Sequence, residues 1–146
     1  MAILVDKKEI LKTFLKTKPN LNKPIFNSLL HQTVCGGKVE FTEMLIDYGL
    51  DVNSYFSDAD GTPIHVAITY TRHNSIKITQ MLLKKGASIK IRNREGNSPL
   101  ESALKKKNSQ KLDFIKVIAH HQHNNGNLQS YNCDFSFRTI KLEQIL

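Results

Sequence analysis

The side chains best suited to acid–base chemistry are two histidines, His31 and His65, which lie 34 residues apart. A histidine works as a general acid or base when a nucleophile, a carboxylate or a substrate stands within hydrogen-bond reach of its ring. The sequence shows no glycine-rich phosphate loop, no nucleophile elbow and no paired-carboxylate constellation to supply such a partner. We therefore expect no catalytic residues, and we do not expect an enzyme.

A cluster of three histidines, His120, His121 and His123, precedes Cys133 and Asp134 and is the one candidate for a metal site. Structural zinc needs four ligands in a tetrahedral array, and neither CxxC nor HxxxH spacing occurs here. Histidines also suit the C-terminal end of a helix, where positive charge interacts favourably with the helix dipole. The sequence favours a solvated helix end, so we expect no metal and no cofactor.

The composition places the chain among ordinary globular proteins. It has 146 residues, 40% of them hydrophobic, with only seven glycines and four prolines. This length suits one domain, and the composition excludes collagen-like and low-complexity proteins. Cys35 and Cys133 are too few for a disulfide framework, and no segment approaches the roughly 18 apolar residues of a membrane helix. Residues 2–5 are too short for a signal-peptide core, so we expect a cytoplasmic protein with free, inert thiols.

The formal net charge of +8 is concentrated in one stretch. Residues 84–116 contain ten basic and three acidic residues, a net charge of +7. Residues 1–83 contain nine basic and eight acidic residues, and residues 117–146 sum to zero. A local excess of this kind indicates an anionic partner and does not specify a fold.

Three apolar trios with i, i+3, i+4 spacing recur at intervals of 37 and 36 residues, and each predicts one face of a helix. They are Phe41-Met44-Leu45, Ile78-Met81-Leu82 and Phe114-Val117-Ile118. The first two helices are followed by Gly49 and Gly86, where a left-handed C-cap is expected. A degenerate copy with four apolar residues begins the chain: Ile10, Leu11, Phe14 and Leu15.

The segments that precede these helices repeat as well. Residues 62–67 (Thr-Pro-Ile-His-Val-Ala) and 98–103 (Ser-Pro-Leu-Glu-Ser-Ala) each begin with a hydroxyl N-cap and a proline at the first helical position. Ser28 is the predicted cap of the earlier copy, three residues before His31. Residues 58–61 and 93–96 precede two of the caps and are typical of tight turns.

At these residues the sequence resembles the ankyrin repeat, whose signature is Thr-Pro-Leu-His-x-Ala followed, after a second helix, by Gly-Ala-Asp-Val-Asn. Residues 62–67 match with Ile for Leu, and residues 49–53 match with Leu for Ala. The resemblance implies an all-α solenoid of stacked helix-turn-helix units with short hairpin loops. It implies an ankyrin repeat domain over 1–122, made of an N-terminal capping half-repeat at 5–22 and repeats at about 23–55, 56–92 and 93–122.

The family also implies a structural role for His31 and His65, since the motif histidine hydrogen-bonds backbone and ties neighbouring repeats. The sequence departs from the family where Glu101 replaces this histidine and where residues 120–122 replace the final Gly-Ala. About three extra residues separate the paired helices near 71–75 and 105–110.

The tail, residues 123–146, is not explained by the repeat. Its alternation of apolar and polar residues from Tyr131 to Phe137 favours an extended segment, and 140–146 could form a short helix. Three interpretations remain: a cap over the last repeat, an arm that docks on a partner or directs export, and an element exchanged with a second copy.

In ankyrin repeats the hairpin tips and the ends of the first helices face the concave binding side. The resemblance therefore implies a partner surface on repeats two and three. The residues it selects are Tyr55, Phe56, Asp58, Asp60, Tyr70, Arg72, Lys90, Arg92, Arg94, Glu95, Asn97, Lys105, Lys106 and Lys107. Aromatic residues beside arginine are frequent anchors of protein interfaces.

The implied function is a non-enzymatic adaptor or inhibitor, monomeric when free, that binds an acidic protein surface. The Lys-, Asn- and Ile-rich usage is similar to that of ankyrin proteins of intracellular bacteria and of insect or pox viruses, which implies a host-interaction protein in host cytoplasm. The alternative is a nucleic-acid-associated protein that uses the same basic residues, although no recognition motif supports it. No basic amphipathic helix stands out, so membrane binding is not expected.

Overall fold

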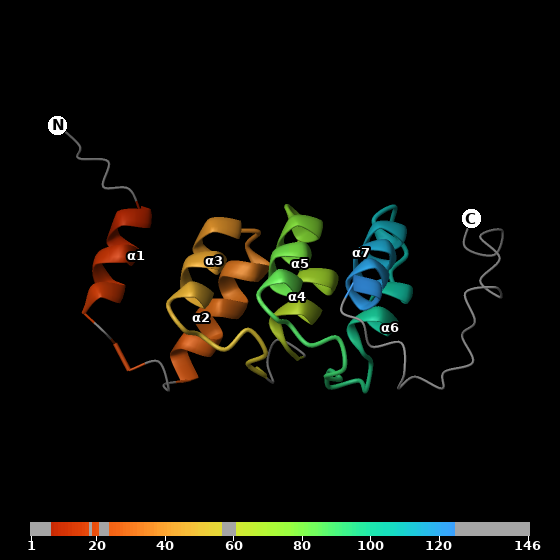
Figure 1. Cartoon of the computed structure of the whole chain (residues 1–146), viewed down its shortest axis with the longest axis horizontal. Helices are drawn as coiled ribbons and strands as arrows, with labels where there is room; N and C mark the ends of the chain where they lie inside the picture. The colour runs from red at the N-terminus through yellow and green to blue at the C-terminus, as the bar shows by residue number, and fades with distance from the viewer. Residues whose placement is uncertain (1–6, 18, 21–23, 57–60, 125–146) are drawn as a thin grey trace.

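The computed structural model describes residues 7–17, 19–20, 24–56 and 61–124, and these residues form seven helices. The helices are α1 (Lys7–Lys16), α2 (Pro24–Cys35), α3 (Val39–Asp47), α4 (Pro63–Thr69), α5 (Ser75–Lys84), α6 (Pro99–Leu104) and α7 (Lys111–Asn124). After the single helix α1, the helices pair as α2–α3, α4–α5 and α6–α7, and the pairs stack along one axis (Figure 1). We refer to these pairs as repeats one, two and three.

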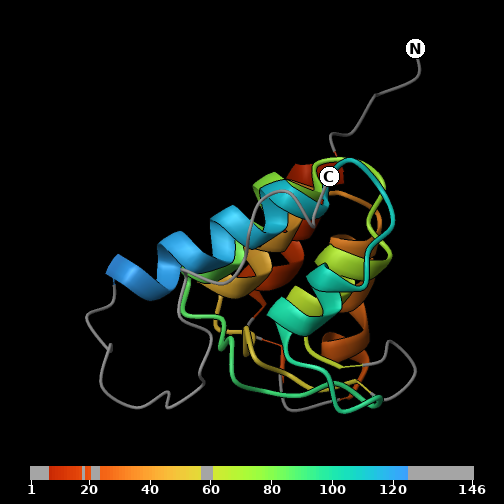
Figure 2. The same ribbon diagram turned by 90° about the vertical axis from the view of Figure 1, so that its right-hand side faces the viewer.

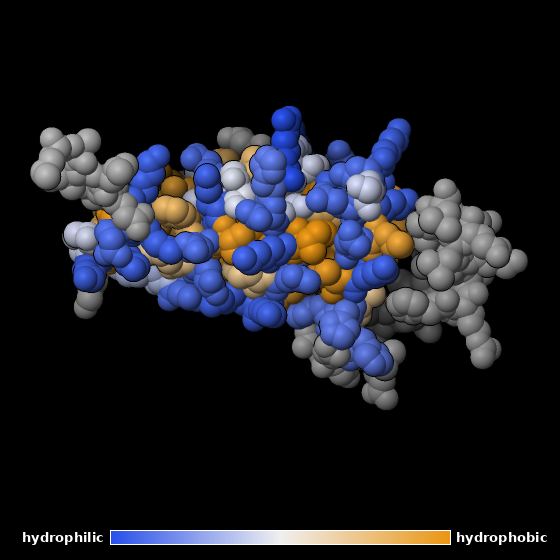
Figure 3. Space-filling view, turned by 90° about the horizontal axis from the view of Figure 1, so that it is seen from above, coloured by the Kyte–Doolittle hydropathy of each residue, from blue (hydrophilic) through white to orange (hydrophobic). Residues whose placement is uncertain are grey.

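The paired helices form two layers. Figure 2 looks along the stack and shows α2, α4 and α6 in one layer, α3, α5 and α7 in the other, and the loops that join successive repeats along one edge. Seen from above, hydrophilic side chains cover most of the surface, and apolar surface shows between them over the middle of the stack (Figure 3). The predicted all-α stack of helix pairs is confirmed.

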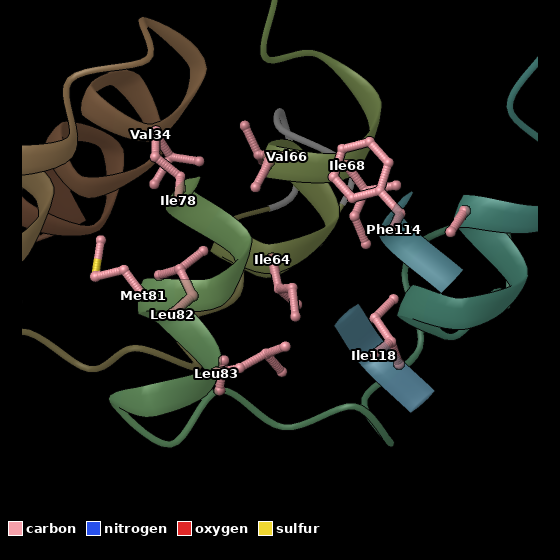
Figure 4. Close-up of a cluster of buried hydrophobic side chains, with 13 residues drawn as sticks. Val34, Ile64, Val66, Ile68, Ile78, Met81, Leu82, Leu83, Phe114 and Ile118 are labelled. Atoms are coloured by element: carbon pink, nitrogen blue, oxygen red, sulfur yellow. The ribbon is translucent and has the colours of Figure 1, made fainter. Parts of the chain in front are cut away.

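The main core runs through all three repeats. The predicted trios lie on α3, α5 and α7, and Ile78, Leu82, Phe114 and Ile118 are fully buried. Figure 4 shows Ile64 of α4 between Leu82 and Ile118, whereas Ile78 lies beside Val34 of α2 and Phe114 beside Ile68 of α4. Neighbouring repeats thus cover each other's apolar faces. Burial of one such side chain contributes roughly 1.5–3 kcal/mol, which a single helix pair of this size cannot collect alone.

A smaller cluster attaches α1 to repeat one. Leu15 of α1 packs with Phe26 and Leu30 of α2 and with Leu45 of α3. The degenerate apolar copy in α1 is only partly buried, because Ile10 is 54% exposed and Phe14 is 45% exposed. The reason is geometric: α1 has no second helix of its own within the described residues, so a neighbour covers only one of its faces.

The first helices of repeats two and three begin where the proline motif predicts. Thr62 and Ser98 are the N-caps, in extended conformation, and Pro63 and Pro99 occupy the first helical positions. At α6 the hydroxyl of Ser98 accepts the N–H of Glu101 (3.3 Å), and the carboxylate of Glu101 accepts the N–H of Ser98 (2.6 Å). This reciprocal pair satisfies two of the donors that a helix start leaves unpaired.

The predicted N-cap at Ser28 is wrong. Helix α2 begins at Pro24, so Ser28 lies inside the helix, and its hydroxyl accepts the side-chain amide of Gln32 (3.0 Å). A proline fits the first position of a helix because its missing N–H has no partner there in any case. The upstream proline therefore starts α2 one turn earlier than the serine would.

A glycine stands just after the end of α3 and just after the end of α5. Gly49 and Gly86, just past α3 and α5, have φ values of 114° and 93°, which a residue with a Cβ rarely adopts. Helix α7 has no glycine at the corresponding place and continues for 14 residues, against 9 for α3 and 10 for α5. The extra residues predicted between paired helices lie in the longer connections 70–74 and 105–110, compared with 36–38 in repeat one.

Candidate functional site

The two motif histidines are structural links between repeats. Nε2 of His31 lies 3.0 Å from the Gly61 carbonyl oxygen, and Nε2 of His65 lies 3.1 Å from that of Asn97. Both residues are buried, and each ring bonds a backbone carbonyl of the next repeat. The structural role that the resemblance implies for them is confirmed.

Both ring nitrogens of His65 have partners. Nε2 donates to the Asn97 carbonyl, which can only accept, and Nδ1 lies 2.9 Å from the hydroxyl of Thr62. Burial lowers the pKa of His65, because a charged imidazolium would lose its hydration. One side chain therefore holds its own helix cap and the loop of the following repeat.

Glu101 occupies the same motif position in repeat three and behaves differently. Its carboxylate turns back to the Ser98 N–H and also accepts Arg92 Nη1 (2.8 Å). The hydrogen bond from the Ser98 backbone is the main reason that the pKa of Glu101 lies below its usual value. Glu101 thus bonds its own helix cap and the loop that precedes it, whereas His65 bonds the loop of the following repeat.

Two adjoining hollows lie between repeats two and three, at the ends of α4 and α6. The larger has a volume of about 530 Å³ and the smaller about 260 Å³. Thr69, Tyr70 and Lys106 line both, so the two form one continuous depression. The larger hollow is lined largely by polar residues of the connections after α4 and α6, among them Arg72 and Gln110.

The depression brings together six of the residues that the sequence selects. Tyr70, Arg72, Glu95, Asn97, Lys105 and Lys106 line one hollow or both. Six others line neither hollow: Tyr55, Phe56, Lys90, Arg92, Arg94 and Lys107. The remaining two, Asp58 and Asp60, lie outside the described residues.

Several residues outside the depression have local partners. Phe56 is half-buried, with its ring 5.5 Å from the ring of His31, and its backbone pairs with Gly61. Arg92 donates to the Gly96 carbonyl (2.6 Å) and to Glu101. Both side chains thus support the loops in which they lie, whereas Tyr55 and Arg94 are exposed.

The charges within the depression are unequal. Lys105 pairs with Glu95 (3.3 Å), whose carboxylate also accepts the side-chain amide of Asn97 (2.9 Å). Lys106 is half-buried, with Nζ 5.2 Å from the centre of the Phe114 ring, and burial lowers its pKa. The lining residues therefore include three cations and one carboxylate: Arg72, Lys105 and Lys106, and Glu95.

Part of the lining, above all Ser102, is not predicted from the sequence. This residue is only 8% exposed, lines the smaller hollow, and has no hydrogen-bond partner for its hydroxyl among the described residues. Val66 holds the corresponding place in repeat two, 36 residues earlier, and is buried in the core. The signal available in the sequence was this hydroxyl at a position where the preceding repeat has an apolar residue.

The described part of the chain offers no group of three or more His, Cys, Asp or Glu residues that could hold a metal ion. His120, His121 and His123 lie in the last turns of α7, and Cys133 and Asp134 fall outside the described residues. Cys35 is free and exposed at the end of α2. Within the same ranges, none of the helices combines the length and the apolar character needed to cross a membrane.

Comparison with known proteins agrees with the helix stack. A family model described as ankyrin repeats (3 copies) matches residues 1–93. The human transient receptor potential cation channel subfamily A member 1 is 30% identical over 104 residues, which are 70% of this chain and 9% of the channel. Mouse Rabankyrin-5 is 31% identical over 87 residues (59% and 7%), and an ankyrin repeat protein of fowlpox virus is 36% identical over 69 residues (47% and 15%).

The chain thus spans less than a sixth of the length of these three relatives. The family match ends at residue 93, and repeat three is recognised from its helix pair and from its packing on repeat two. Because the matched residues cover more than half of the sequence and the helices stack in pairs, this chain belongs to the ankyrin repeat family.

Proposed function

We propose that this protein is a non-enzymatic adaptor or inhibitor that binds an acidic segment of another protein across repeats two and three. An ankyrin repeat domain is a protein–protein interaction module and is typically non-catalytic. The main support for this particular surface is the continuous depression between repeats two and three, most of whose lining residues belong to the basic stretch 84–116.

The electrostatics favour an anionic occupant. Arg72, Lys105 and Lys106 outnumber Glu95 in the lining. A surface hollow lined by one sign of charge attracts the opposite sign and speeds the encounter with it. Carboxylates of a partner protein would therefore be drawn to this part of the solenoid.

The shape favours an extended segment. The two hollows follow one another along the ends of the first helices and share three lining residues, so a peptide chain could lie across both. Tyr70, which is 45% exposed, stands where they meet and offers a large ring surface to such a chain. Tyrosine and arginine supply much of the binding energy at protein interfaces.

We also propose that the protein acts in the cytoplasm. Cys35 is exposed and free, which suits a reducing cytoplasm. One relative is an ankyrin repeat protein of fowlpox virus, and we therefore include action inside a host cell in the proposal.

Selection of a phage-displayed library of random 12-residue peptides tests the proposal. Peptides enriched on the wild-type protein should contain more Asp and Glu than the starting library. A triple variant, Arg72→Glu, Lys105→Glu and Lys106→Glu, should bind them at least about 30-fold more weakly, since it reverses the charge of the depression. Binding is measured by fluorescence polarisation of the labelled peptides.

The matched control carries the same change of charge elsewhere: Lys7→Glu, Lys16→Glu and Lys77→Glu, three exposed lysines of α1 and α5. It should bind the peptides nearly as well as the wild type. Equal loss in both triple variants, or retention of duplex DNA more tightly than the peptides at the same salt concentration, would contradict the proposed surface.

A further inference from the structure

Among the described residues, the buried hydroxyl of Ser102 in α6 has no hydrogen-bond partner, unlike the buried hydroxyls of Thr42 in α3 and Thr79 in α5. Thr42 donates to the Lys38 carbonyl and Thr79 to the Ser75 carbonyl, each at 2.9 Å and four residues back along the helix. This is the usual way in which a helical hydroxyl is satisfied inside a protein. Ser102 makes no such bond among the described residues, although it lies in a helix and lines the smaller hollow.

The ammonium group of Lys106 lines the same hollow. Lys106 lies two residues beyond the end of α6, and its N–H donates to the Ala103 carbonyl (3.1 Å), so the chain is still turning at this point. Ser102 and Lys106 both line the smaller hollow. Within the described ranges Lys106 has the Phe114 ring beneath it and forms no ion pair, whereas the neighbouring Lys105 is held by Glu95.

We propose that the smaller hollow is an anchor site for one carboxylate side chain, an Asp or Glu of the partner segment, with one oxygen on the Ser102 hydroxyl and the other near the Lys106 ammonium. The inference rests on the proposed function and names the group that the surface recognises. A carboxylate supplies the acceptor that the buried hydroxyl lacks and the anion that the half-buried cation lacks.

The size and the charge of the hollow favour a carboxylate over a phosphate. Its volume of about 260 Å³ is enough for one side chain. Phosphate groups are usually held by several arginines, and the smaller hollow offers two lysines and no arginine, with Glu95 already on Lys105. One hydroxyl and one uncommitted ammonium match the two oxygens of a single carboxylate.

The test uses the tightest peptide from the selection and its single Glu→Gln or Asp→Asn derivatives. At one position this substitution should weaken binding to the wild type by about tenfold or more, because it removes a charge-assisted hydrogen bond. On the Lys106→Gln and Ser102→Ala proteins, the same substitution should have a much smaller effect. Such coupling between a peptide position and a protein position identifies a direct contact.

Two matched controls separate the anchor from general effects. Lys107→Gln removes the same charge from an exposed neighbour outside both hollows. Ser54→Ala removes the other buried hydroxyl that lacks a partner among the described residues, in the loop after α3. Both variants should keep the full penalty for the critical peptide position, and thermal melting followed by circular dichroism checks that all four variants are folded.

The outcomes distinguish the two proposals. If the peptides lose binding to the charge-reversed triple variant but show equal coupling to Lys106→Gln and Lys107→Gln, the surface is correct and the anchor is wrong. If the triple variant binds as the wild type does, the proposed function is wrong. A peptide with phosphoserine at the critical position that binds more than tenfold tighter than its glutamate form overturns the carboxylate assignment.

Discussion

Repeats two and three start from nearly the same motif and use it differently. Both first helices begin with a hydroxyl cap and a proline, and both place a fully buried alanine five residues after the cap, Ala67 and Ala103. All residues from 61 to 68 are buried, whereas Pro99, Ser102 and Ala103 are the buried residues of α6. The two repeats differ most in the pair before the alanine, which is His-Val in one and Glu-Ser in the other.

The difference shows that the bonds made by a motif residue depend on where its repeat lies in the stack. Repeat two is held on both sides, by His31 on its Gly61 carbonyl and by its own His65 on the Asn97 carbonyl. Repeat three has no further repeat to hold within the described residues, and its Glu101 closes on its own cap. The residues of repeat two are therefore used mainly for packing, and the border between repeats two and three carries the polar surface that we propose for binding.

The largest effect on the free energy of unfolding should come from truncating the same core position to alanine in each of the two repeats. Ile64→Ala is expected to lower the free energy of unfolding by about 2–5 kcal/mol, since Ile64 is fully buried. Leu100→Ala, 36 residues later, should cost about 1–2 kcal/mol, because Leu100 is only partly buried. Urea unfolding measures both, and equal losses would show that repeat three is packed as firmly as repeat two.

The motif position should give the next largest contrast. His65→Ala is expected to cost about 2–3 kcal/mol, because it leaves the Thr62 hydroxyl and the Asn97 carbonyl without their partner. Glu101→Ala should cost about 1 kcal/mol, the usual value of a helix cap. His31→Ala is the control and should resemble His65→Ala, since it removes the equivalent link; chemical denaturation that ranked Glu101 above the histidines would contradict the comparison.

Lowering the pH should reduce the stability of the protein through His65 and through Glu101 in two different pH ranges. The pKa of His65 is lowered from 6.5 in the folded state, so the unfolded chain takes up the proton first. Stability should therefore fall as the pH drops below about 6.5, less steeply in His65→Ala. The pKa of Glu101 is lowered from 4.5, so its contribution is present above that pH and is lost only at more acidic values. Urea titrations at a series of pH values, with Glu101→Gln as the second variant, check the order.

The smallest effect is expected at the position after the motif residue. Val66→Ala should cost about 1–2 kcal/mol, because it removes two buried methyl groups from the core. Ser102→Ala should change stability by less than about 0.5 kcal/mol or raise it slightly, since the lost hydroxyl has no partner in the described residues. A large loss on Ser102→Ala would reveal a structural bond for this hydroxyl and would weaken the proposed anchor.

Local signals made much of the fold predictable. Apolar spacing located α3, α5 and α7, and the prolines after Thr62 and Ser98 located the starts of α4 and α6, because periodicity and caps act within a few residues. The error at Ser28 arose where two local start signals competed and the upstream proline prevailed.

The candidate site was less predictable because it depends on side chains far apart in the sequence. The connection after α4 meets the connection after α6, and only packing decides which of their polar residues share a hollow. Residue type also misleads: Phe56 was selected as an interface aromatic and lies half-buried beside His31. The ion pairs of Arg92 and Lys105 likewise follow from three-dimensional proximity and not from spacing.

The histidine links have a direction, because each runs from one repeat to the loop of the next repeat along the chain. A loop is therefore held only while the repeat before it stays folded, and α6 follows the last loop that such a link holds. Between repeats two and three, transient opening should then begin in repeat three. In amide hydrogen exchange, α6 and α7 would exchange their amide protons before α4 and α5, so the proposed binding border would lie beside the repeat that opens first.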